Sequence, residues 1–228
     1  VGVFDKTITR RSGETIPTIV LQFESRMYEN YRNLTYGKSH FCLEKVKKLD
    51  PLLIDVWLNT LMVERLQDKT QYILDLLKRH HNDWETSFYI RIARSFGFGV
   101  NADPFEMLAR SIPYIVLLRH RNDLLQIEAL LFGQAGFLEE ARIFDDYYCL
   151  LRKEYLHLKN KYKLAPLQKH IWKFMRLRPV NFPTIRLAQF ASLIIKSEGL
   201  FSEILSHTKL SAVRAVVQAT ASEFWNTH

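Results

Sequence analysis

The sequence predicts a mainly α-helical protein, a multi-helix bundle preceded by a short β-hairpin. Two observations support this fold class. From Asp50 onward, apolar residues recur every three or four positions, which is the spacing of an amphipathic helix. Only 8 glycines and 7 prolines interrupt 228 residues, of which 47% are hydrophobic. A chain of this length can bury a sizeable core without disulfides.

The first 25 residues predict the hairpin. The polar sequence RRSGET has the composition of a hairpin turn and is flanked by β-branched and aromatic residues. The expected arms contain Val1, Val3 and Ile8 on one side and Ile16, Ile19, Leu21 and Phe23 on the other. A lone two-stranded hairpin is marginal in water. We therefore expect 1–25 to be the remnant of a sheet outside this chain, and 26–228 to be the helical domain. The exposed hairpin also makes a dimer through it an expectation.

Capping residues divide the rest of the chain into helices. The predicted N-caps are Asp50, Asn82 or Asp83, Asp103 and Asn122, and the predicted helix ends are Gly97 and Gly133. Asp50 and Asp103 are each followed by a proline, which suits the first helical position. Glu106, three residues after Asp103, completes a capping-box variant.

The longest helix is predicted from Leu138 to about Lys163. Its apolar and aromatic positions follow in steps of three and four: Ala141, Phe144, Tyr148, Leu151, Tyr155, Leu158 and Tyr162. A coiled-coil dimer would use such a seam. The aromatic residues in it favour the other reading, a core helix of a bundle.

The positive charge is concentrated in one part of the sequence. The net charge is +8, and residues 151–200 carry 11 basic but only 2 acidic side chains, whereas residues 101–150 carry 4 and 8. Segregated charge of this kind predicts a basic face. The candidate anion-binding or nucleic-acid-binding residues are Lys159, Lys163, Lys169, Lys173 and Arg176.

Trp172 and Phe174 lie between these cations in the sequence. Planar groups among cations are typical of nucleic-acid-binding surfaces. The alternative is a solvated basic face whose aromatic residues belong to the core, because basic faces are common and many bind nothing in particular. The sequence leaves both readings open.

Two further arginines receive a structural interpretation. Arg178 and Phe182 each precede a proline and are therefore expected to be extended, and Pro183 is expected to start a helix. Arg178 and Arg186 are predicted to anchor this region internally, because carbonyls in loops between helices need hydrogen-bond donors. Arg186 and Gln189 are predicted to share one face of the helix.

Motifs of known chemistry are absent from the sequence. It contains no G-x-S-x-G, Walker, H-E-x-x-H or C-x-x-C pattern, so we assign no catalytic residue, metal ligand or cofactor. FGFG is interpreted as a turn before a helix, and His80, His81 and His120 lack the partners of a usual metal site. Cys42 and Cys149 stand alone, which favours a reducing, cytoplasmic location. No apolar run reaches the length of a membrane span.

Four stretches carry a family resemblance: DPLLIDVWLNTLMVERL, WETSFYIRIARSFGFGVNADPFEMLARS, LLQIEALLFGQAGFL and FMRLRPVNFPTIRLAQFA. From Ile16 on, the chain resembles an uncharacterised bacterial family defined only as a domain of unknown function. The resemblance implies longer relatives whose N-terminal region is nuclease-like, with this chain matching their middle-to-C-terminal helical part. No cluster of nuclease-like carboxylates falls on positions of this chain.

The sequence therefore predicts a protein of unknown function with a helical accessory domain. Its basic face is expected to bind an anionic partner, with nucleic acid the favoured class, next to a nuclease-like region outside the chain. The alternative is a purely structural or protein-interaction module whose arginines pair with its own carboxylates. Whether the protein is an enzyme stays open.

Overall fold

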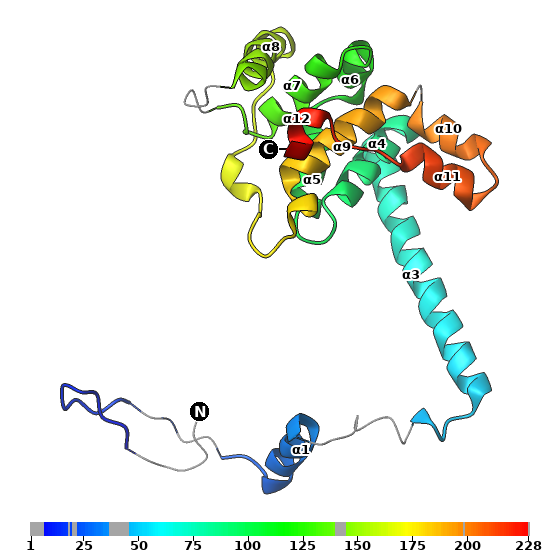
Figure 1. Ribbon diagram of the computed structural model, residues 1–228. Coiled ribbons are helices and arrows are strands. Elements are labelled where there is room, and N and C mark those ends of the chain that lie inside the picture. Colours follow the sequence, from blue (N-terminus) through cyan, green and yellow to red (C-terminus); the bar gives the residue numbers. More distant parts are fainter. Residues whose placement is uncertain are drawn as a thin grey trace. The chain divides into compact units, whose positions relative to one another are not determined.

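The computed structural model describes residues 7–17, 19, 22–36, 46–139, 145–197 and 199–227. Within these ranges the chain is mainly helical, with eleven α-helices and two short 3-10 helices (Figure 1). The chain divides into an N-terminal unit, Val1–Leu66, and a C-terminal unit, Gln67–His228. The predicted boundary near residue 25 is not tested by this division and stays a prediction.

The predicted β-hairpin is not formed by strands in the described part of the N-terminal unit. An isolated antiparallel bridge joins Thr9 to Thr15, and the amide of Ile16 donates to the carbonyl of Ile8 at 2.8 Å. The predicted turn is present between them, but a strand needs a longer ladder of such pairs. Positions 1–6 and 20–21 of the predicted arms lie outside the described residues. The described residues therefore provide no strand edge for the predicted dimer.

Helix α1 (Ser25–Tyr36) and the first half of α3 (Pro51–Arg79) complete the described N-terminal unit. Asp50 caps α3 as predicted, because its Oδ1 accepts a hydrogen bond from the amide of Leu52 at 2.9 Å. Leu53 and Trp57 of this helix are 60% and 61% exposed, and no described residue up to Leu66 is buried. The helical spacing predicted the helix correctly, but its apolar residues do not line a core within this unit.

The C-terminal unit continues with three helices: α4 (Trp84–Phe96), α5 (Ala102–Ser111) and α6 (Tyr114–His120). Asp83 caps α4, as the sequence indicates, and its Oδ1 accepts from the amide of Thr86 at 3.1 Å. The predicted cap at Asp103 is wrong. Helix α5 begins at Ala102, so Asp103 lies in its first turn and pairs with Arg94 instead.

Two further helices pack against each other, α7 (Leu124–Gln134) and α8 (Asp146–Tyr162). Asp123, not Asn122, caps α7 and accepts from the amide of Leu125 at 2.9 Å. Helix α8 begins eight residues later than predicted, after its N-cap Asp145, because Leu138 belongs to a turn. Residues 140–144, which the predicted helix includes, lie outside the described residues.

The packing of α7 on α8 explains Gly133, which the sequence predicted as a helix end. Gly133 lies inside α7, where a Cβ atom would sit 2.0 Å from the ring of Tyr155. Glycine is therefore required for close approach of α8. Tyr148, Leu151, Tyr155 and Leu158 are all buried, so the seam of α8 faces a core within its own chain.

The rest of the unit consists of short elements around one longer helix: η1 (Lys169–Ile171), η2 (Pro179–Asn181), α9 (Pro183–Lys196), α10 (Leu200–Ser206), α11 (Leu210–Val217) and α12 (Glu223–Thr227). Pro183 starts α9, as predicted. Helix α9 packs against α4, α7 and α12 (Figure 1).

The core of the C-terminal unit is built from side chains that are fully shielded from solvent. They include Ala93, Phe105, Leu108, Leu117, Ile127, Leu130, Leu131, Phe132, Leu187, Phe190 and Leu193, each 0% exposed. Burial of such side chains stabilises a fold by roughly 1.5–3 kcal/mol for each large residue. No helix of the described ranges has both the length and the apolar character needed to cross a membrane.

Candidate functional site

The structure locates the predicted cations on the end of α8 and on the segment that follows it. We call residues 163–182 the basic segment. Lys159 is half-buried in the last turn of α8, and Lys163 is the left-handed C-cap of that helix. Lys163, Lys169, Lys173 and Arg176 are exposed. Across the described residues, no carboxylate forms an ion pair with Lys163, Lys173 or Arg176.

Two buried amide side chains hold the backbone of the basic segment. Asn101 accepts from the Lys173 amide and donates to the Lys173 carbonyl, each at 2.9 Å. The side chain of Gln134 donates to the Ala165 carbonyl at 2.6 Å, and the backbone carbonyl of Gln134 accepts from the amide of Leu167 at 2.8 Å. Asn101 and Gln134 are 3% and 0% exposed. Bonds to such buried groups fix the path of the segment, because breaking them would leave polar atoms unsatisfied.

The aromatic residues of the basic segment point into the protein. Trp172 is 5% exposed, donates from Nε1 to the Ala135 carbonyl at 2.8 Å and contacts Phe105 edge-on. Phe174 is half-buried and meets Phe182 edge-on at 5.4 Å. Trp172 therefore does not offer a planar surface to a ligand. Of the two interpretations that the sequence allows, the one that assigns Trp172 to the core is correct.

Phe98, which the sequence did not single out, is the exposed ring beside the basic segment. It is 60% exposed, with a backbone φ of +51°. The guanidinium of Arg186 lies over its ring, with Cζ 4.4 Å from the ring centroid. Phe98 lies three residues before Asn101, whose side chain binds the backbone of Lys173. The signal in the sequence is the aromatic residue between the two glycines of FGFG.

The two arginines with a predicted structural role differ in their surroundings. Arg186 is half-buried and donates to the side-chain oxygens of Gln189, at 2.8 Å, and of Asn181. Burial lowers its pKa. Arg178 is exposed, and its carbonyl accepts from the amide of Asn181 at 2.8 Å. Arg186 and Gln189 thus share a helix face, as predicted. The partners of Arg186 are side-chain amides and not backbone carbonyls.

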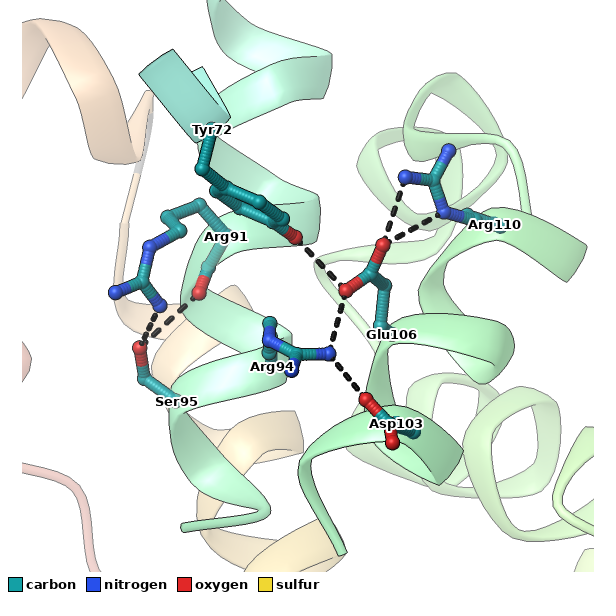
Figure 2. A network of polar contacts seen from close by, with 7 residues as sticks. All are labelled: Tyr72, Arg91, Arg94, Ser95, Asp103, Glu106 and Arg110. Atoms are coloured by element: carbon teal, nitrogen blue, oxygen red, sulfur yellow. Dashed lines mark hydrogen bonds and ion pairs between the residues drawn. The ribbon is translucent and has the colours of Figure 1, made fainter. Parts of the chain in front are cut away.

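A second polar group gathers around Glu106 of α5 (Figure 2). Glu106 accepts from the hydroxyl of Tyr72 at 2.8 Å, from Arg94 at 2.8 Å, and from Arg110 at 2.7 and 3.0 Å. Arg94 also binds Asp103 at 2.5 Å. The guanidinium of Arg94 lies 5.9 Å from the Tyr72 ring centroid. These contacts join the C-terminal half of α3 to α4 and α5.

The charges around Glu106 shift the pKa values of this group. Burial acts to raise the pKa of Glu106, but hydrogen bonds from Arg110, Tyr72 and Arg94 outweigh it and hold that pKa below its usual range. Burial, together with the bond to Glu106, raises the pKa of Tyr72 to about 12. Each oxygen of the carboxylate is occupied by donors of the same chain. We therefore assign this network a structural role.

The carboxylate of Glu128, on α7, is fully buried and accepts hydrogen bonds from three uncharged donors. It accepts from the hydroxyl of Tyr147 at 2.7 Å, from Ser222 at 2.7 Å and from Nε1 of Trp225 at 2.9 Å. Trp225 also stacks on Phe132, with ring centroids 3.9 Å apart. Burial and Glu128 together raise the pKa of Tyr147. The hydrogen bonds of Glu128 therefore connect α12 to α7.

An open pocket of about 610 Å³ lies among α4, α6, α9 and α10. Its lining consists of Glu85, Tyr114, Leu118, Lys196, Gly199, Ser202 and Glu203. Glu85 accepts from the hydroxyl of Ser202 at 3.0 Å. The sequence could not reveal this pocket, because its residues lie on helices far apart along the chain.

Among the histidines considered as metal ligands, His120 makes other side-chain contacts. His120 contacts Gln126 through Nδ1 at 2.5 Å and the Tyr162 hydroxyl through Nε2 at 2.8 Å. Burial and the nearby Arg110 lower the pKa of His80. No group of three or more metal-ligating side chains is found among the residues that the structure describes. Cys149 is exposed on α8, and Cys42 lies outside the described residues.

A comparison with protein families decides the affiliation of the chain. A family model described as "Protein of unknown function (DUF2851)" matches residues 1–228. The chain belongs to this family. No curated protein and no solved structure matches it. The DUF2851 match agrees with the resemblance to a domain of unknown function. The bacterial origin, the nuclease-like neighbouring region and the cytoplasmic location stay predictions.

Proposed function

We propose that this member of DUF2851 binds an anionic partner through the basic segment and the end of α8, and that the partner is nucleic acid. The observation that carries the proposal is the charge pattern of one continuous stretch. From residue 155 to 197 the sequence has nine lysines and arginines and no aspartate or glutamate. Phosphate groups are the anions whose spacing suits several cations along one segment.

The surroundings of these cations support the proposal. Lys163, Lys173 and Arg176 are exposed and carry no ion pair within the described part of the chain. Their charges therefore face solvent and are available to a partner. Other arginines of the same unit, such as Arg94 and Arg110, have carboxylate partners instead.

The fixed backbone of the segment supports it as well. Asn101 and Gln134 hold the segment at two points. A ligand that binds there does not have to order a flexible loop first, which reduces the entropic cost of association. Exposed cations on a fixed backbone thus combine charge with preorganisation.

The proposal can be tested by fluorescence anisotropy with short labelled single strands and duplexes at a series of salt concentrations. We expect the logarithm of the association constant to fall linearly with the logarithm of the salt concentration. The triple change Lys163→Gln, Lys173→Gln and Arg176→Gln should weaken binding and reduce the magnitude of that slope by about 2–3.

A matched control keeps the same change in net charge. The triple change Lys69→Gln, Lys78→Gln and Arg79→Gln removes two exposed lysines and one exposed arginine from α3. It should leave the slope within about one unit of the original value, as expected for cations that contact no phosphate. Absence of binding at low salt, or equal losses in both variants, would rule out the basic segment as the binding surface.

The second candidate function is a helical module that binds protein, here a second copy of the chain. It is favoured by the exposed apolar residues of α3, among them Leu53 and Trp57. Under this alternative, Trp57→Glu should abolish self-association in sedimentation experiments, and salt should have little effect on it. A monomer at all concentrations would contradict it.

A further inference from the structure

We propose that the nucleic-acid partner is single-stranded and that Phe98 is the platform on which one of its bases stacks. This inference rests on the proposed function and specifies its substrate class. The loop between α4 and α5 carries Phe98, an exposed aromatic residue next to the basic segment.

The conformation of Phe98 presents the ring outward. Its φ of +51° is in the left-handed region, which a bulky residue seldom adopts. The amide of Phe98 donates to the Ser95 carbonyl at 3.1 Å, and that of Asn101 donates to the Gly97 carbonyl at 3.0 Å. A Cβ at Gly97 would lie 2.2 Å from the Asn101 carbonyl oxygen, so the tight loop needs this glycine. An exposed ring held in an unfavourable backbone conformation is typical of a functional position.

Arg186 prepares one side of the ring for this role. Its Cζ lies 4.4 Å from the ring centroid, so its guanidinium covers one face of Phe98. Hydrogen bonds to Asn181 and Gln189 hold the guanidinium there. Phe98 is still 60% exposed, so much of the residue remains accessible to a partner. A cation on one face of a ring also adds positive charge close to where a nucleotide would bind.

The loop that carries Phe98 is hydrogen-bonded to the basic segment. Asn101 follows Phe98 by three residues and forms two hydrogen bonds with the backbone of Lys173. Met175 and Val180, in the same segment, are 83% and 62% exposed. The loop that carries Phe98 and the segment that carries the cations are therefore joined through Asn101.

This combination favours a single strand over a duplex. The faces of bases in a duplex are already stacked on their neighbours, whereas those of a single strand are free to stack on an aromatic side chain. A duplex would contact the cations alone and would leave Phe98 without a partner. A single strand can use the ring and the cations together.

The test compares Phe98→Ala with wild-type protein on a labelled single strand and on a duplex of the same sequence. Loss of one stacked base should weaken single-strand binding by about 5- to 150-fold. Duplex binding should change less than about twofold, because phosphate contacts are kept. The matched control is Ile115→Ala, which truncates a side chain that is 55% exposed on α6, and it should leave both affinities unchanged.

A second variant separates binding from folding. Phe98→Gly suits the left-handed backbone, so relief of strain should offset the lost contact with Arg186 and keep the melting temperature close to that of wild type, while single-strand affinity is lost as in Phe98→Ala. Phe98→Trp should keep or increase that affinity. A Phe98→Gly protein that binds the single strand as well as wild type would overturn the inference.

The remaining outcomes distinguish the inference from the proposed function. If Phe98→Ala binds normally while the triple change in the basic segment abolishes binding, the stacking platform is wrong and the proposed function stands. If wild-type protein binds neither strand form at low salt, both fail. Binding to anionic phospholipid vesicles that is lost in Phe98→Ala, with no effect on single strands, would overturn the inference in favour of a membrane surface.

Discussion

Two groups of cations in the C-terminal unit differ in what surrounds them. Arg94 and Arg110 meet Glu106, a carboxylate whose side chain is 15% exposed, and both hydrogen-bond to it (Figure 2). Lys173 and Arg176 have no such partner in the described part of the chain and face solvent. Some cations of this unit thus pair with a carboxylate of the same chain, whereas others face solvent.

Whether a cation of this unit has a carboxylate partner depends on how the helices pack. Glu106 lies 12 residues from Arg94 and 34 from Tyr72, and only the packing of three helices brings them together. The basic segment lacks a carboxylate to pair with. Breaking a paired group should therefore reduce stability, whereas neutralising the unpaired cations should not.

The largest effect is expected for Glu106→Gln. It should lower the free energy of unfolding by about 2–3 kcal/mol, because two partly buried arginines lose the anion that compensates them. Urea unfolding followed by circular dichroism would measure it. The control is Asp103→Asn, whose side chain is 81% exposed, with an expected loss below about 1 kcal/mol. Equal losses would show that burial does not set the strength of this network.

The same network predicts how stability depends on pH. The folded pKa of Glu106 is lowered, so its contribution is complete above the unfolded value of about 4.3 and is lost as pH falls through the folded value. The folded pKa of Tyr72 is raised to about 12, so its contribution is lost as pH rises from about 10 towards 12. Melting temperatures across these windows would test both. Glu106→Gln should flatten the acid limb, and an unchanged limb would contradict the assignment.

An intermediate effect should separate Arg178 and Arg186, the two arginines for which the sequence predicts a structural role. Arg186→Ala should cost about 1–2 kcal/mol, because Asn181 and Gln189 lose their donor and Phe98 loses its stacked cation. Arg178→Ala, at an exposed position, should change stability by less than about 0.5 kcal/mol. Thermal melts of both variants would show the contrast. A larger loss for Arg178→Ala would mean that Arg178, and not Arg186, anchors this region.

A smaller effect is expected for Glu128→Gln, although Glu128 is more deeply buried than Glu106. Its donors are neutral, and an amide oxygen can accept from two of them. No cation is left unpaired, so the change should be within about 1 kcal/mol and could stabilise the protein. A loss equal to that of Glu106→Gln in the same urea titration would show that paired cations are not what makes Glu106 important.

The smallest effect on stability is expected for the basic segment. The triple change Lys163→Gln, Lys173→Gln and Arg176→Gln should shift the free energy of unfolding by less than about 0.5 kcal/mol in total, because exposed charges without ion pairs contribute little. Its urea midpoint should match that of wild type. A large loss would identify these cations as structural and would favour the structural reading of the domain.

Local chemistry alone predicted much of the helical framework. The caps Asp50 and Asp83, the start of α9 at Pro183 and the shared face of Arg186 and Gln189 depend on residues no more than four positions apart. Such short-range contacts form whenever the helix forms, so the sequence is sufficient to predict them. The charge pattern of residues 155–197 is likewise a property of the sequence alone.

The tertiary structure decided what these local features do. Asn101 binds Lys173 across 72 residues, and Gly133 is required by the ring of Tyr155, not by a helix end. The sequence left open whether Trp172 lies at the surface or in the core, and packing places it in the core, while Phe98, between two glycines, is exposed. Helical spacing specifies which residues share a face, but only packing between distant segments determines whether that face is covered. For this reason the sequence could locate the cations but not the aromatic ring beside them.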